Sequence, residues 1–108
     1  MDTIKPHIYS HSINGVQVKP LSEDGKRISI LYNGRLKNTG AEQIYLHYGQ
    51  GNKNSWHRVN EQPMENQAQG WEKTVQLAEN KQLNFCFKDN TDNWDNNQGS
   101  NWAYRISD

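Results

Sequence analysis

The sequence is poor in the residues that most often identify a function. It has one cysteine, three prolines and no net charge at pH 7 in 108 residues. The single Cys86 excludes an intramolecular disulfide, and its place in the apolar run Leu83–Phe87 is typical of a small buried hydrophobe. Balanced charge and a pI of about 6.9 leave no electrostatic footprint for nucleic acid or an anionic membrane, so we expect neither partner.

Long apolar runs are also missing, and none approaches the length of a membrane span. The first residues contain neither an apolar signal region nor a small-residue cleavage site. We therefore expect a cytoplasmic protein, or an extracellular one if the chain is a module excised from a secreted protein. Helical apolar spacing is absent over any useful length, which argues against a helical fold.

Aromatic residues supply what the aliphatic residues do not. Leu, Ile, Val and Phe account for only 19 of the 108 residues, but four Trp and five Tyr are present. Each aromatic side chain can bury about 150–250 Å². A chain of this length with this composition predicts one small domain with a modest, aromatic core.

Short alternating segments recur about every ten residues, with Gly-rich or Asn-rich turns between them. This pattern predicts an all-β protein, either a sandwich or a barrel. Residues 49–54 are interpreted as an open turn, and residues 88–102 as a polar loop that contributes no core. Residues 1–14 are expected to be an arm or an extra strand, and residues 15–108 the module itself. The expected strands are residues 16–18, 28–32, 44–48, 55–59, 71–77, 83–87 and 102–106.

Four aromatic residues are candidates for a binding surface. Alternation places Tyr45 and His47 on the strand face opposite Ile44 and Leu46, and Trp56 and Trp94 follow or lie in polar loops. Flat rings cover the apolar C–H patches of a sugar, while nearby amides bond its hydroxyls. The alternative for any Trp is the core. Trp71 and Trp102 fit the core because each opens an alternating strand, whereas Trp94 fits it least.

Three carboxylates in the polar loop, Asp89, Asp92 and Asp95, allow three interpretations. They could bind Ca²⁺, although the spacing does not match a calcium loop. Two of them could form a glycosidase pair, although so short a chain offers little to build a cleft. The third interpretation, turn and capping hydrogen bonds, is favoured. The four His residues lack metal-ligand spacing, so we expect no metal and no cofactor.

Several blocks of the chain resemble the carbohydrate-binding modules of family 25, over roughly residues 15–106. The blocks are Ile44–Gly49, Trp56, Met64, Gly70–Trp71, Leu83–Asp89, Asn93–Asn97 and Asn101–Trp102. The resemblance implies an immunoglobulin-like antiparallel β-sandwich that binds starch or another α-1,4-glucan, such as glycogen, without cleaving it.

The same resemblance implies a site. It would consist of a platform of His47, Trp56 and Trp94, with Asn96 and Asn97 contacting sugar hydroxyls; Tyr45 joins them from the alternation above. It also suggests a glucan-processing enzyme as a partner. A Ca²⁺-dependent interaction domain and a minimal glycosidase are the alternatives.

Overall fold

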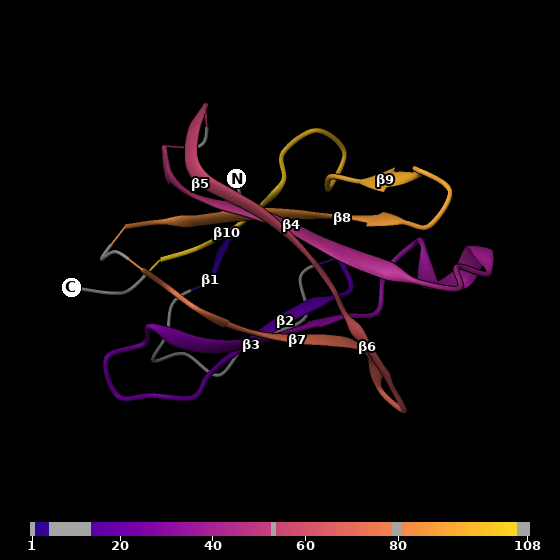
Figure 1. Ribbon diagram of the computed structural model, residues 1–108, viewed down its shortest axis with the longest axis horizontal. Helices are drawn as coiled ribbons and strands as arrows, with labels where there is room; N and C mark the ends of the chain where they lie inside the picture. Colours follow the sequence, from indigo (N-terminus) through magenta and orange to yellow (C-terminus); the bar gives the residue numbers. More distant parts are fainter. Residues whose placement is uncertain (1, 5–13, 53, 79–80, 106–108) are drawn as a thin grey trace.

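Two β-sheets pack face to face in the computed structural model, which describes residues 2–4, 14–52, 54–78 and 81–105 (Figure 1). The expected antiparallel β-sandwich is thereby confirmed. In sheet A the strands lie in the order β1 (Asp2–Ile4), β10 (Trp102–Tyr104), β8 (Leu83–Asp89), β4 (Ile44–Asn52) and β5 (Ser55–Pro63), with β9 (Trp94–Asp95) paired to β8. In sheet B the order is β2 (Val16–Pro20), β3 (Arg27–Tyr32), β7 (Gly70–Gln76) and β6 (Glu65–Gln67).

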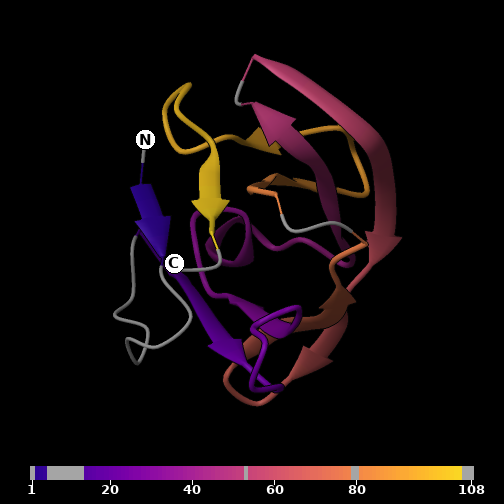
Figure 2. The same ribbon diagram turned by 90° about the vertical axis from the view of Figure 1, so that its left-hand side faces the viewer.

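The strand pairs of the described residues are antiparallel except at one edge. There β1 runs parallel to β10, with Asp2 opposite Trp102 (Figure 2). Residues 5–13 of the expected arm and Ile106 of the expected last strand lie outside the described residues. The division at residue 14 therefore stays a prediction.

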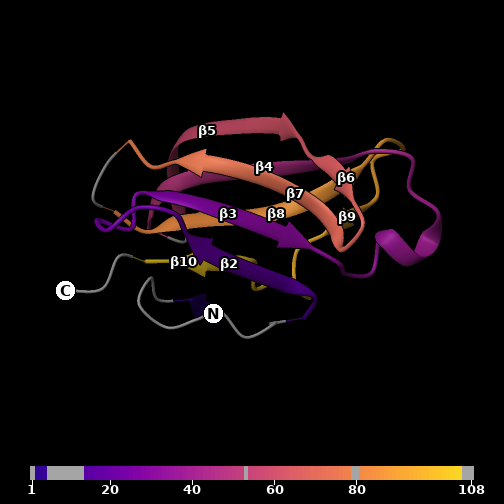
Figure 3. The ribbon, with the colours of Figure 1, turned by 90° about the horizontal axis from the view of Figure 1, so that it is seen from below.

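Period-two alternation builds the core between the sheets. In β2 and β3 every second side chain is buried. Figure 3 shows the strands of sheet B lying in front of those of sheet A. Strand β8 is buried at every position from Leu83 to Phe87, with the polar Asn84 included. Trp71 and Trp102 are core residues, as expected. The largest fully buried side chains are Trp102, Tyr32, Tyr104, Phe85 and Phe87.

The open turn expected at residues 49–54 was wrong, because β4 continues to Asn52 and β5 starts at Ser55. The polar Gln50 is buried here, since its side chain accepts a hydrogen bond from the Ala78 N–H and donates one to the Lys81 carbonyl. A β-bulge shifts the register with β5 between Tyr48 and Gln50. The Gly and polar residues here form part of an irregular strand pair. Their composition is the same as that of a loop, so composition alone does not distinguish the two structures.

Strand β5 is also longer than expected. It runs to Pro63 at the edge of sheet A, where a residue without an N–H is tolerated. Met64, which follows it, is buried in the core. The chain then passes directly into β6 of the other sheet.

Residues 88–101 add no side chain to the hydrophobic core, as expected, and Trp102 belongs to it, but the segment is not an open polar loop. Strand β8 extends to Asp89, β9 forms within the segment, and the side chains of Asp89, Asp95 and Asn97 are buried. Each of these polar groups has hydrogen-bond partners inside the protein. A buried polar group does not destabilise a protein strongly when it has such hydrogen-bond partners.

One buried hydrogen bond joins the two sheets. The Tyr32 hydroxyl in β3 donates to Asp95 Oδ2 in β9 at 2.6 Å and accepts from the Leu36 N–H at 3.0 Å. The Tyr32 ring stacks on Phe87 of β8, with ring centroids 4.1 Å apart. Burial, followed by the bond to Asp95, raises the pKa of Tyr32 above its ordinary range. The hydroxyl therefore remains protonated and donates to the carboxylate at any physiological pH.

Helix is confined, among the described residues, to one 3-10 turn at Lys37–Thr39. No helix in that part of the chain has the length and apolar character needed to cross a membrane.

Tyr32→Phe should destabilise the protein by about 1–3 kcal/mol, because it leaves a buried carboxylate and a buried N–H without their shared partner. Urea denaturation measures the loss. Tyr104→Phe is the matched control: its hydroxyl donates to a single carbonyl, that of Gly25, and we expect a loss of about 1 kcal/mol. Equal stability of Tyr32→Phe and the wild type would contradict the proposed importance of this bond.

Candidate functional site

Three rings from three segments meet on the outer face of sheet A. The His47 ring lies 6.1 Å from Trp56 with the planes tilted by 38°, and 5.3 Å from Trp94 with the planes at 87°. Trp94 leaves 43% of its surface exposed, so it does not plug the core. His47 and Trp56 are half-buried. We call these three residues the aromatic platform.

Strand pairing fixes His47 and Trp94. His47 stands opposite Cys86 in β8 on one side and Glu61 in β5 on the other. Trp94 stands opposite Lys88, and its carbonyl accepts a hydrogen bond from the Arg35 guanidinium. Because Asp95 points inward to Tyr32, strand alternation turns its neighbour Trp94 outward.

Gly49 makes room for Trp56. A Cβ added at Gly49 would lie 3.1 Å from the Trp56 Cβ and 3.1 Å from the Val59 Cγ2. That is closer than ordinary van der Waals contact. The glycine that suggested a turn in the sequence therefore lets β5 lie closely over β4, beside His47.

Asp89 organises the turn that leads into Trp94. Its Oδ1 accepts hydrogen bonds from the Thr91 and Asn93 N–H groups, both at 2.9 Å, and its Oδ2 accepts one from the Asn93 side chain. The side-chain bond from Asn93, followed by these backbone bonds, holds the pKa of Asp89 at about 2. The ionised carboxylate of Asp89 thus stabilises the turn through these hydrogen bonds.

A chain of charges borders the platform. Glu61 Oε1 lies 3.3 Å from His47 Nδ1, and Glu61 Oε2 lies 3.1 Å from Lys88 Nζ. Lys88 Nζ also lies 5.6 Å from the Trp94 ring centroid, 5.7 Å from that of Tyr45, and 3.6 Å from Asp92. The hydrogen bond to Glu61 raises the pKa of Lys88, so the amine is charged at neutral pH.

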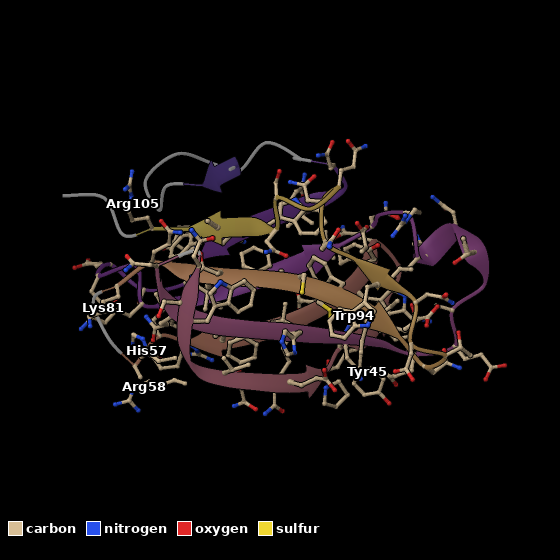
Figure 4. All side chains as sticks on the ribbon, turned by 90° about the horizontal axis from the view of Figure 1, so that it is seen from above. Tyr45, His57, Arg58, Lys81, Trp94 and Arg105 are labelled. Carbon is tan, nitrogen blue, oxygen red and sulfur yellow. The ribbon has the colours of Figure 1, made fainter. Side chains whose placement is uncertain are left out.

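The remaining predicted site residues differ in position. Tyr45 is half-buried beside Lys88, and Figure 4 shows it on the same side as Trp94, away from His57, Arg58, Lys81 and Arg105. Asn96 is exposed, and its Oδ1 accepts from the Gly99 N–H. Asn97 is buried, where it donates to the Asn101 carbonyl and accepts from the Asn14 side chain. Its side chain is therefore committed to holding the loop.

The three Asp residues considered for metal or catalysis are not gathered on one cleft. Asp89 accepts hydrogen bonds within its own turn, and Asp95 accepts one from the Tyr32 hydroxyl. The side chain of Asp92 is 83% exposed. Among the residues that the structure describes, no group of three or more His, Cys, Asp or Glu side chains is placed to hold a metal ion.

Sequence reasoning missed Glu61 and Lys88. Lys88 continues the alternation that places Cys86 on the outer face of β8, so a longer β8 would have indicated it. Glu61 had no such signal, because β5 was expected to end at Val59.

Comparison with known proteins gives two findings. The model of a starch/carbohydrate-binding module family, family 53, matches residues 28–85, just over half of the chain. That range includes His47 and Trp56 and ends before Trp94. The chain is also 37% identical over 95 residues to an alpha-amylase of Clostridium acetobutylicum, covering 86% of this chain and 12% of the amylase. No solved structure matches.

Asp89→Asn should lower stability at neutral pH, because both oxygens of Asp89 accept hydrogen bonds, one of them also from the Thr91 hydroxyl, whereas an amide has only one acceptor oxygen. Since the pKa of Asp89 is depressed on folding, its stabilisation is complete above the ordinary Asp value and disappears as the pH falls from about 4 to about 2. Thermal melts of both proteins across this range measure it. A stability difference that stays constant down to pH 2 would contradict the assignment.

Proposed function

The chain belongs to the starch/carbohydrate-binding modules of family 53, and we propose that its aromatic platform binds α-1,4-linked glucans without cleaving them. The match confirms the starch-binding module expected from sequence and places it in family 53, whereas the sequence blocks resembled family 25. The observation that carries the proposal is the position of His47 between two Trp rings.

The platform offers what a sugar chain requires. Each pyranose ring has apolar C–H faces that gain free energy when they are covered by an indole. Its hydroxyls need polar partners at the margin, because a desolvated hydroxyl without a hydrogen bond is unfavourable. The His47 ring and Lys88 supply such groups beside the indoles, and the exposed Asn96 follows Trp94 by two residues.

The inclination of the rings favours an α-linked glucan. The Trp56 plane is tilted by 38° and the Trp94 plane by 87° from that of His47, so the faces do not lie in one plane. An α-1,4 chain curves and turns successive sugars to different angles, whereas a β-1,4 chain is a flat ribbon. A flat ribbon would stack on one indole and miss the other.

The proposed role is binding without hydrolysis. A glycosidase needs two carboxyl groups on either side of the scissile bond, roughly 5 to 10 Å apart. Glu61 borders the platform, but its oxygens engage His47 and Lys88. Asp92, the next carboxylate, is almost fully exposed and lies on Lys88.

A glucan-processing enzyme is the proposed partner. The matched alpha-amylase is far longer than this chain, which spans 12% of it. A binding module beside an amylase would hold the enzyme on its insoluble substrate and raise the local substrate concentration. The cytoplasmic location expected from the sequence stays a prediction.

Titration with maltoheptaose should change the Trp fluorescence, and cellohexaose should have little effect. We expect a Kd of roughly μM to mM, about −4 to −8 kcal/mol, because a shallow platform buries little area. Amylopectin incubated with the protein should release no reducing sugar. Equal responses to the two oligosaccharides would contradict the α-glucan assignment, and dependence of either response on Ca²⁺ would favour the interaction-domain alternative.

Trp94→Ala should weaken maltoheptaose binding by about five- to 150-fold with little change in stability, because stacking of one flat ring on an aromatic side chain is worth about 1–3 kcal/mol. The matched control is Leu21→Ala, which removes a side chain of similar exposure, 44%, in the β2–β3 connection. Isothermal titration and thermal melts measure the two effects. Unfolding of Trp94→Ala, or normal binding by it, would exclude Trp94 from the proposed site.

A further inference from the structure

Glu61 connects His47, a member of the aromatic platform, with Lys88 at the border of the platform. One carboxylate oxygen lies 3.3 Å from His47 Nδ1, and the other lies 3.1 Å from Lys88 Nζ. The three residues come from neighbouring strands: His47 from β4, Glu61 from β5 and Lys88 from β8. Glu61 therefore reaches across β4 to Lys88 of β8, the strand on which β9 and its Trp94 are paired.

The bond to Glu61 selects one form of the His47 ring. An ionised carboxylate only accepts hydrogen bonds, so Nδ1 must carry the proton that joins them. In a neutral imidazole the other nitrogen, Nε2, then bears a lone pair and can only accept. A free imidazole in water favours the opposite tautomer, with the proton on Nε2.

Lys88 orders the rings on either side. Its amine lies 5.6 Å from the Trp94 centroid and 5.7 Å from the Tyr45 centroid, within the range of cation–π attraction. The side chain is only 20% exposed, so its stem packs along these rings. If the carboxylate of Glu61 were removed, the Lys88 amine would still have an ion pair with Asp92, whose side chain is 83% exposed.

We propose that Glu61 is the positioning residue of the sugar site: it fixes His47 as a hydrogen-bond acceptor at Nε2 and holds Lys88 between Trp94 and Tyr45. This inference rests on the proposed function and adds to it that one hydroxyl of the glucan donates a hydrogen bond to His47 Nε2. A bound sugar always has hydroxyl donors available, and an acceptor fixed in advance loses no free energy in changing tautomer.

The charged neighbours of His47 support this assignment. Glu61 faces it from β5, Lys88 and Cys86 lie on β8, and Asp92 follows β8. Burial raises the pKa of Cys86 to about 12, so the thiol is uncharged beside the ring. The nearest anion to His47 is therefore Glu61, and its charge is shared with Lys88.

Nitrogen-15 NMR of the ligand-free protein tests the first step. Spectra are taken at a pH well above the ordinary imidazole pKa of about 6.5, so that the rings are neutral. His47 should carry its proton on Nδ1 in the wild type and mostly on Nε2 in Glu61→Ala. Glu61→Gln should be intermediate, because its amide oxygen still accepts from Nδ1. A proton on Nε2 in the wild type, or an unchanged tautomer in Glu61→Ala, would overturn the proposal.

Sugar titration tests the second step. Maltoheptaose should shift the Nε2 resonance of the wild type and leave Nε2 unprotonated. Glu61→Ala should raise the Kd for maltoheptaose by roughly three- to tenfold, the worth of about one hydrogen bond. The matched control is Glu65→Gln, an exposed carboxylate of β6 in the other sheet, which should change neither the tautomer nor the Kd. Unchanged affinity in Glu61→Ala would overturn the positioning role.

The two proposals fail differently. If the wild type binds no maltoheptaose but carries its His47 proton on Nδ1, the proposed function is wrong while the Glu61–His47 arrangement stands. If the wild type binds maltoheptaose with the His47 proton on Nε2, the function stands and the role of Glu61 is wrong. Melting curves of each variant ensure that only folded protein is compared.

Discussion

The hydrogen bond from Tyr32 to Asp95 is the constraint on which the placement of the aromatic platform depends. It joins β3 of one sheet to β9 of the other through the interior of the sandwich. A two-residue strand such as β9 has too few ladder bonds to hold itself in place. Anchoring Asp95 inward fixes the register of β9 on β8, and that register turns Trp94 out toward His47. A site on the surface is thus positioned from the core.

The polar segment around Trp94 follows the same logic. Its buried groups, Asp89 and Asn97 among them, bond to the backbone of their own turns, and none of the described residues has a buried side-chain nitrogen or oxygen without a hydrogen-bond partner. Binding loops on a rigid scaffold can be irregular without being loose when their backbone groups are satisfied in this way. The segment therefore presents an exposed indole, Trp94, in a fixed orientation, and stacking on it requires little further ordering.

Sequence reasoning found the elements whose patterns are local. The sandwich, most strands, the buried Trp71 and Trp102, and the outward face of Tyr45 and His47 all follow from period-two alternation. It failed where a polar or Gly residue has a partner distant in sequence. Gln50 is buried by bonds to residues 78 and 81, and Asp95 by a bond to Tyr32, 63 residues away. Such partners leave no trace in a window of neighbouring residues, so both segments were interpreted as open loops. Glu61 was missed for the related reason that an exposed edge strand has no buried face to mark its length.

Charge placement around the platform suits a neutral ligand. Lys88 pairs with both Glu61 and Asp92 at the margin of the rings, so the three groups together leave a single negative charge and a sugar meets paired charges rather than a strong field of one sign. Paired charges that are partly exposed keep much of their hydration. They can form hydrogen bonds with a sugar hydroxyl, and they do not need a charged ligand to balance them. Because the rings and their polar partners come from adjacent strands of one sheet, binding needs little rearrangement. The small area of contact and the desolvation of sugar hydroxyls then limit affinity, and a glucan with many repeats can compensate by offering many equivalent positions.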